Sequence, residues 1–189
     1  MSIHPIEVES YRILDARVDL SHLPRGPRAI VARVIHATAD LDFAQTMRVD
    51  TAAVEAGVAA LRAGAAVITD VEMVRAGLTG IDAVCYLAET GPAAMGDTRS
   101  AAAMRLAAAR HPAGAVVVVG CAPTALVEAV ELARAGAFSP ALVIGLPVGF
   151  VGAAEAKDLA HAAAIPTITN VGEKGGSAVA AGAFNALVR

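Results

Sequence analysis

From residue 64 onward one pattern recurs: a short apolar run, then a polar or glycine-rich turn, then a segment with helical periodicity. The apolar runs are rich in β-branched residues and cover residues 65–69, 83–87, 115–119, 141–144 and 167–169. The helical segments between them are roughly 10–15 residues long, the length of crossover helices in parallel βαβ units. The four valines at 116–119 show no polar alternation, as expected when helices cover both faces of a sheet. The pattern predicts an α/β fold with a mainly parallel, five-stranded sheet.

One domain spanning residues 1–189 accounts for the whole chain. Its 189 residues are enough for a sizeable core, and no linker, low-complexity segment or longer repeat divides them. The chain is 56% hydrophobic and 17% charged, which excludes a disordered protein. Because 46 residues are alanine and none is tryptophan, we expect closely packed small side chains in an interior poor in aromatic rings.

The first 64 residues lack the strand–turn–helix pattern. Residues 1–19 mix charged and apolar side chains, and we expect short, extended stretches there. Pro24, Gly26 and Pro27 then break the chain before residues 30–35, where isoleucine and valine recur at helical spacing. We expect a helix that ends near Asp40, with a strand as the alternative because these residue types also favour strands.

The mean hydropathy of +0.59 makes a membrane span worth testing. The longest uncharged stretch, residues 135–154, is long enough to cross a bilayer. It contains two prolines and four glycines, however, and a lipid-exposed helix could not satisfy its backbone through so many breaks. We therefore expect a buried strand followed by a glycine-rich loop. Residues 1–12 carry three charged side chains and no apolar core, so no signal peptide is expected.

The charge and the cysteine content argue against several kinds of partner and site. The formal net charge is −3 and no run of lysine or arginine occurs, which argues against a nucleic-acid partner. Cys85 and Cys121 are isolated, without a CxxC or Cys/His spacing of the zinc type. We expect neither a disulfide nor a structural metal site, and the simplest location for the protein is the cytoplasm.

The turns after the predicted strands are the place to look for a ligand, because open parallel sheets bind ligands beyond the carboxyl ends of their strands. These turns are rich in Gly, Pro, Thr and Ser, and helix N-termini that follow them can bind anions. Arg99 and Lys174 lie at or just before predicted helix N-termini, where a cation is disfavoured by about 0.3–1 kcal/mol. Either these cations meet a ligand with several carboxylates or phosphates, or they extend into water.

Familiar catalytic and nucleotide-binding motifs are absent: the sequence has no GxxxxGK[ST] and no GxGxxG after a strand, and residues 175–179 lack the last glycine of GxSxG. Among five histidines, His36 differs because it follows the apolar helical stretch 30–35 and precedes a polar one. An imidazole, with an ordinary pKa of about 6.5, gives and takes a proton near neutral pH. The alternative is a core histidine that is satisfied by hydrogen bonds.

The chain contains six distinctive segments, at residues 33–40, 69–74, 98–100, 122–126, 147–153 and 174–177. They closely resemble the precorrin-8X methylmutase family of the cobalamin pathway, which includes the cobalt-precorrin-8 enzyme. The resemblance spans nearly the whole chain in order, including residues 6–7 and 10–11, and its PVGFVGA and APTAL strings are specific.

This resemblance implies a flavodoxin-like, three-layer α/β/α sandwich and a homodimer with active sites near the subunit interface. It implies an isomerase that moves a methyl group from C-11 to C-12 of a ring-contracted tetrapyrrole, precorrin-8X or cobalt-precorrin-8, to give hydrogenobyrinate or cobyrinate. Since substrate and product are isomers, no cofactor is expected. The family's catalytic histidine falls on His36, which would protonate the macrocycle and promote a sigmatropic shift.

Nine further residues are candidates for binding the substrate, whose rim carries many carboxylates. These are Ser10, Arg33, Asp70, Thr98, Arg99, Pro123, Thr124, Lys174 and Ser177. The helix N-termini after Gly120 and Gly176 are candidate anion partners as well.

The chain also departs from the family pattern at a few positions. Cys121 stands where Asn is common, Ala39 replaces a usual Gly, Ala156 interrupts a usual Glu-Ser-Lys, and Glu173 replaces a basic residue. The changes at Cys121 and Glu173 weaken the case for carboxylate contacts there. Two other functions stay open: a corrinoid carrier without chemistry, and a phospho-ligand-binding domain, which would lack its glycine fingerprint.

Overall fold

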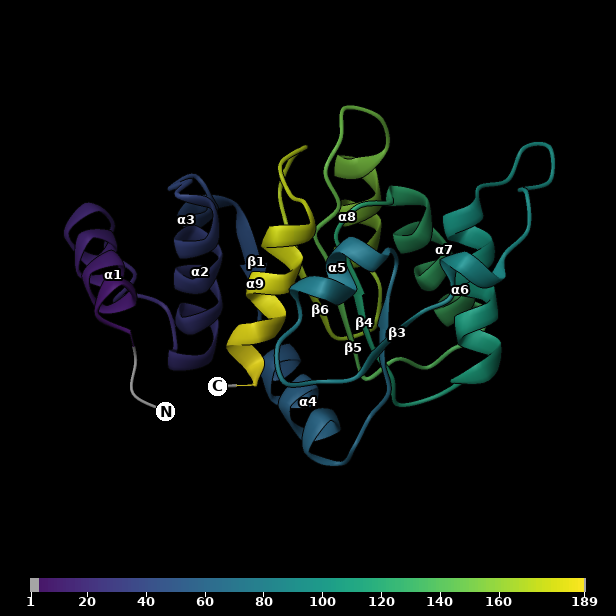
Figure 1. Cartoon of the computed structure of the whole chain (residues 1–189), viewed down its shortest axis with the longest axis horizontal. Helices are drawn as coiled ribbons and strands as arrows, with labels where there is room; N and C mark the ends of the chain where they lie inside the picture. Colours follow the sequence, from purple (N-terminus) through teal and green to yellow (C-terminus); the bar gives the residue numbers. More distant parts are fainter. Residues whose placement is uncertain (1–3, 189) are drawn as a thin grey trace.

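The computed structural model describes residues 4–188 and has a six-stranded sheet at its centre (Figure 1). The strands are β1 (Met47–Val49), β2 (Val67–Thr69), β3 (Ala83–Cys85), β4 (Val116–Val119), β5 (Leu142–Gly145) and β6 (Thr167–Asn170). Their order across the sheet is β1-β6-β5-β4-β2-β3. The five predicted strands are confirmed and are mutually parallel, each within about two residues of its expected bounds.

Helices cover both faces of the sheet, which confirms the expected three-layer sandwich. They are α1 (Pro5–Arg17), α2 (Arg25–Thr38), α3 (Phe43–Thr46), α4 (Thr51–Arg62), α5 (Glu72–Gly77), α6 (Arg99–Arg110), α7 (Pro123–Arg134), α8 (Ala153–His161) and α9 (Ser177–Leu187), with a 3-10 turn at Leu87–Glu89. Val116 and Val118 pack into the core under α2, α4, α5 and α9, whereas Val117 and Val119 pack under α6, α7 and α8. This alternation explains why every residue of β4 is apolar.

The parallel strands follow the order β3-β2-β4-β5-β6, which is the 2-1-3-4-5 order of flavodoxin-like folds. The expected number of five strands is wrong by one, because β1 adds a sixth strand, antiparallel to β6. Strand β1 has only three residues, too few to show a periodicity, and Met47 pairs with Asn170 far along the chain. Its existence depends on that distant partner.

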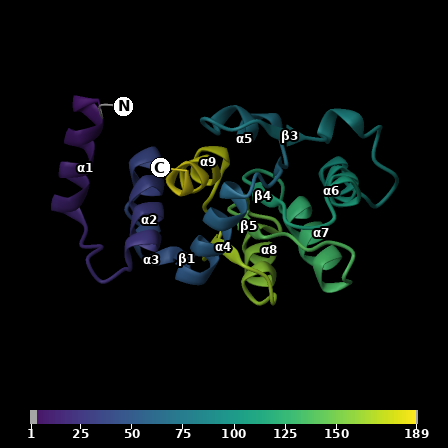
Figure 2. The same ribbon diagram turned by 90° about the horizontal axis from the view of Figure 1, so that it is seen from below.

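The N-terminal segment differs most from expectation, because residues 5–17 form helix α1 and not extended stretches. The His4 side chain accepts the N–H of Ile6, and Pro5 occupies a first-turn position that suits proline. Leu14 is the one fully buried residue of α1, which packs on α2 at one end of the molecule (Figure 2). Helix α2 ends at Thr38, so the helical interpretation of residues 30–35 is confirmed.

The apolar stretch at residues 135–154 contains β5 and the loop that follows it, as expected. Within residues 4–188, none of the helices combines the length and apolar character that a bilayer crossing requires.

Candidate active site

His36 lies in the last turn of α2, half-buried beneath α1. Its Nδ1 is 2.8 Å from Oγ of Ser10, and its ring stacks on Tyr11 with centroids 4.9 Å apart and planes inclined by 10°. Both partners are neighbours on α1, so one helix orients the imidazole of another. A hydrogen bond and a ring contact therefore fix the orientation of the imidazole.

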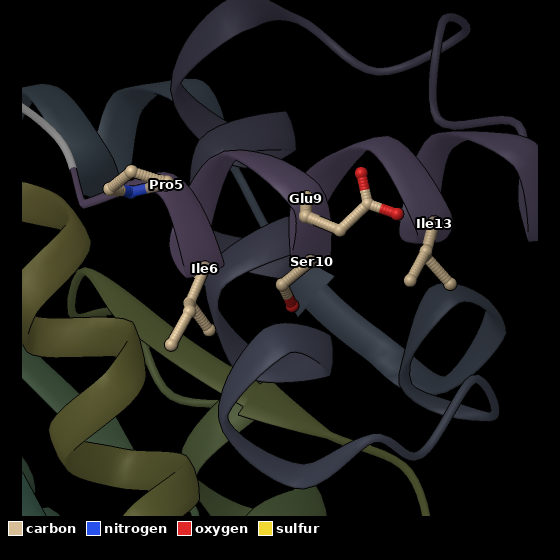
Figure 3. A pocket seen from close by; sticks show the side chains of 5 residues that line it. All are labelled: Pro5, Ile6, Glu9, Ser10 and Ile13. Carbon is tan, nitrogen blue, oxygen red and sulfur yellow. The ribbon is translucent and has the colours of Figure 1, made fainter.

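Two hollows adjoin this histidine. A small one, about 90 Å³, is lined by Ser10, Ile13, Leu14, Arg17, Ile35, His36, Ala39 and Leu41. A larger one, about 480 Å³, lies along α1 and is lined by Pro5, Ile6, Glu9, Ser10 and Ile13. Figure 3 shows Ile6, Ser10 and Ile13 pointing to the same side of α1. Ser10 and Ile13 line both hollows, so the two lie next to each other along α1.

Arg33 lies one turn before His36 on α2, as its spacing predicts, but its charge is already paired. Its Nη1 donates to Oε1 of Glu7 over 2.7 Å, and both side chains are about four-fifths buried, with 19% and 18% exposed. This ion pair is a second link between α1 and α2 beside the Ser10–His36 contact.

Lys174 also has protein partners. Its Nζ donates to Oδ2 of Asp40 at 2.7 Å and to Oδ2 of Asp42 at 2.6 Å, which connects the loop after β6 to the segment that follows α2. The hydrogen bond to Asp40 raises the pKa of Lys174, and the same bond lowers the pKa of Asp40. The sequence did not single out these acidic partners, because nothing local indicates which loop lies across from residues 40–42.

Asp70 follows β2, beside β4, where a flavodoxin-like sheet usually opens for a ligand. Its carboxylate is 2% exposed and accepts the backbone N–H groups of Gly120, Cys121 and Ala122 at 2.8–3.1 Å. Burial raises the pKa of Asp70, and the three N–H bonds oppose that rise. The donors expected to bind an anion after Gly120 are therefore taken up by the protein's own carboxylate.

A third group gathers at the N-termini of α6 and α7. Thr98 caps α6 by accepting the N–H of Ala101, and its hydroxyl donates to Oγ1 of Thr124 at 2.8 Å. Arg99 is the first residue of α6 and donates to the carbonyl of Leu87 at 2.9 Å. Across the part of the chain that the structure describes, no carboxylate lies within ion-pair distance of Arg99, so its charge is available to an acidic ligand.

The loop containing residues 147–152 joins these groups. Pro123 opens α7 beside Gly152, and the Gly149 N–H donates to the Glu173 carbonyl at 3.1 Å. Gly176 donates to the carbonyl of Leu146 at 2.8 Å, so its N–H does not point to a ligand. Phe150 and Val151 project from the loop with 91% and 88% of their surfaces exposed.

The predicted site residues thus form separate groups. Ser10, Arg33 and His36 lie together, Lys174 and Ser177 lie in or just after the loop following β6, and Thr98, Arg99, Pro123 and Thr124 lie at the starts of α6 and α7. The first and last groups belong to elements at opposite ends of the molecule's long axis (Figures 1 and 2). One copy of the chain does not bring them around a common cavity.

Sequence reasoning overlooked Lys157, which is fully buried in α8. Its Nζ donates to Oδ1 of Asn170 at 3.1 Å and to the carbonyl of Lys174 at 2.7 Å. A signal was present: Lys157 lies one helical turn from the apolar positions Ala153 and Ala160, on the face that turns inward.

Comparison with known proteins agrees with this architecture. The family model described as precorrin-8X methylmutase matches residues 5–189. The cobalt-precorrin-8 methylmutase of Methanothermobacter thermautotrophicus is 40% identical over 90% of this chain and 84% of its own length. The precorrin-8X methylmutase of Pseudomonas aeruginosa is 41% identical over 95% of this chain and 91% of its own.

A solved structure, the precorrin-8X methyl mutase from Thermus thermophilus, superimposes with a TM-score of 0.89 at 40% identity, over 97% of this chain and 94% of that one. Sequence and fold therefore agree over almost the full length of both proteins. The family match covers α1 and α2, which carry Ser10 and His36, as well as the whole sheet. The chain belongs to the precorrin-8X methylmutase family of isomerases.

Proposed function

We propose that this protein moves the methyl group on C-11 of precorrin-8X, or of cobalt-precorrin-8, to C-12, giving hydrogenobyrinate or cobyrinate in cobalamin biosynthesis. The observation that carries the proposal is the held imidazole of His36, with Ser10 at Nδ1 and Tyr11 against the ring. Relatives named for both the metal-free and the cobalt substrate match this chain at about the same identity, so both substrates enter the test.

In the proposed reaction His36 is the general acid. Ser10 at Nδ1 orients the imidazole that delivers the proton to the macrocycle. Protonation draws electrons towards the ring, the bond from the methyl carbon to C-11 breaks as its bond to C-12 forms, and the proton returns to His36. Substrate and product are isomers, so the balance needs no methyl donor, nicotinamide or protein-bound metal.

The substrate carboxylates would bind where cationic and hydroxyl groups are accessible. Arg99 can donate two hydrogen bonds to one carboxylate, with Thr98, Thr124 and the Pro123 turn beside it. Lys174 would exchange Asp42, whose side chain is 69% exposed, for a substrate carboxylate, with Ser177 nearby in sequence. Arg33 would hold α1 in place beside His36 through its ion pair with Glu7.

Asp70 contributes differently. Its buried carboxylate would not contact the substrate; it would act indirectly, by holding the backbone at Gly120–Ala122 in place.

A homodimer would complete the site. Among the described residues, those that line the 480 Å³ hollow all come from α1, and Ile6 is 73% exposed there, so a second wall would be needed to enclose a flat macrocycle. A second copy packed against α1 would supply that wall and could bring its own Arg99 group towards His36. Analytical ultracentrifugation should show a dimer, and Ile6→Asp should yield monomers with little activity. Fully active monomers would contradict this arrangement.

The decisive test is to incubate the purified protein with precorrin-8X and with cobalt-precorrin-8 and to follow the absorption spectrum. Conversion of either substrate supports the proposal, and His36→Ala should bind the tetrapyrrole without converting it. A coloured complex that never isomerises would instead indicate a corrinoid carrier. The free thiols of Cys85 and Cys121 are consistent with action in the cytoplasm, where thiols stay reduced.

A further inference from the structure

Lys157 is the most unusual charged residue of the described chain, because its whole side chain is buried between α8 and the end of β6. A buried ammonium is costly unless its protons are bound. Burial lowers the pKa of Lys157 to about 8, which shows how poorly this environment tolerates the charge. An apolar side chain at this position of α8 would cost less free energy to bury. The hydrogen bonds of Lys157 therefore need a functional explanation.

Hydrogen bonds from Lys157 and from Asn170 meet at one backbone carbonyl. The carbonyl oxygen of Lys174 accepts Nζ of Lys157 at 2.7 Å and Nδ2 of Asn170 at 2.9 Å. Asn170 in turn accepts from Lys157 through Oδ1, at 3.1 Å, and its amide also donates to the Val171 carbonyl. Two buried side chains thus bind both ends of the loop at residues 171–174.

The anchored carbonyl determines what the loop presents. With the peptide of Lys174 turned inward, its side chain extends to the surface, where half of it is exposed. The next residue, Gly175, passes so close to the Leu146 and Pro147 carbonyls that a Cβ would lie 2.3–2.4 Å from their oxygens. Hydrogen bonds from Gly149 to Glu173 and from Gly176 to Leu146 then join this loop to residues 146–152.

We infer that Lys157 is a positioning residue for substrate binding: from inside the fold it holds the loop at residues 171–176, and so sets where Lys174 meets a substrate carboxylate. This inference rests on the proposed function, since it assigns Lys174 to the substrate. Lys157 itself touches no substrate, so its removal should weaken binding more than the methyl shift.

The chain offers a matched control because Lys157 and Lys174 are its two lysines. In Lys157→Met the loop loses its anchor, whereas in Lys174→Met the surface cation is lost and the anchor stays. We expect KM to rise about tenfold in both variants, with kcat within about twofold of wild type. Hydrogen exchange separates them: the amides of Gly149 and Gly176 should exchange at least about tenfold faster in Lys157→Met and at the wild-type rate in Lys174→Met.

An unchanged KM or unchanged exchange in Lys157→Met would overturn the inference. Should that variant fail to fold, wild-type exchange decides: Gly149 and Gly176 must exchange more slowly than the amides of the exposed loop around Gly91 and Gly96, and equal rates would overturn the inference. A wild-type protein that converts neither tetrapyrrole refutes the proposed function instead. The exchange result would still establish or exclude the anchor in that case.

Discussion

Oγ of Ser10 lies 2.8 Å from Nδ1 of His36, and this contact joins α1 to α2 at the candidate active site. The hydroxyl holds one edge of the imidazole, so the orientation of the ring depends on α1 as much as on α2. The Ser10–His36 contact and the Arg33–Glu7 ion pair together hold the largely exposed α1 against α2.

His36→Ala should lower kcat by about 10²–10⁴-fold, the usual contribution of a general acid, while tetrapyrrole binding persists. Ser10→Ala should lower kcat by about tenfold, because the imidazole of His36 remains present but is no longer oriented by the hydroxyl. Ser21→Ala is the control: it removes an exposed hydroxyl whose partner, the exposed Asp19, lies outside the site, so turnover should not change. Absorbance assays of turnover measure all three, and full turnover by His36→Ala would remove its role.

Ala39→Gly should stabilise the protein. Ala39 ends α2 with φ of +56°, and it is the one non-glycine residue of positive φ among those described. A left-handed conformation costs a Cβ-bearing residue about 1–2 kcal/mol, part of which glycine's greater freedom when unfolded offsets. We expect a gain of about 1 kcal/mol in the free energy of unfolding, measured in urea by circular dichroism.

The neighbouring substitution Ala37→Gly provides the comparison for Ala39. Ala37 has helical geometry in the same helix, so glycine there should cost about 1 kcal/mol. Equal effects at both positions would contradict the backbone argument.

Thr169→Val should also raise the free energy of unfolding, by about 1 kcal/mol, because a buried hydroxyl without a partner is costly. Oγ1 of Thr169 is the one buried side-chain oxygen or nitrogen in the described chain that makes no hydrogen bond. Valine keeps the shape and the strand preference of threonine. Thr69→Val should have the opposite effect, since Oγ1 of Thr69 donates to the Val84 carbonyl on the neighbouring strand. Similar losses in both variants would show that Thr169 is bonded.

The burial of Lys157 predicts a pH dependence of stability. Its pKa falls from 10.5 to about 8 on folding, so between these values the unfolded chain binds more protons than the folded one. Stability therefore rises with pH across this window, by about 3 kcal/mol relative to Lys157→Met. Desolvation is the main cause; the nearby charges of Asp158, Arg48 and Glu173 modify it, and the first two pair with each other.

Urea unfolding of the wild type and of Lys157→Met between pH 7.5 and 10.5 measures this dependence, because other titrating groups cancel in the difference. Lys174→Met is the control, and its difference should stay flat over this range. The hydrogen bond to Asp40 raises the pKa of Lys174 above 10.5, so the stability that Lys174 contributes is lost only as pH rises beyond 10.5. A flat difference for Lys157→Met would show that Lys157 is not desolvated.

The parallel core could be predicted from local patterns in the sequence. The β-branched runs at β2 to β6 and the helices between them are local patterns, and neither depends on a distant partner. His36 stood out for a local reason too, since an imidazole ended an apolar helical face. The glycine expected at Ala39 is a further case, because the backbone there does have the conformation that favours glycine.

Which side chains meet depends on how distant segments pack. Strand β1 exists through its pairing with β6, and α1 keeps its position through contacts with α2. The sequence suggested that Lys174 and Asp70 bind a ligand through their charges. In the fold, however, Lys174 pairs with two carboxylates and Asp70 accepts three backbone N–H groups. Helix and strand follow from spacing along the chain, whereas the partner of a charge depends on segments far apart in sequence that only packing brings together.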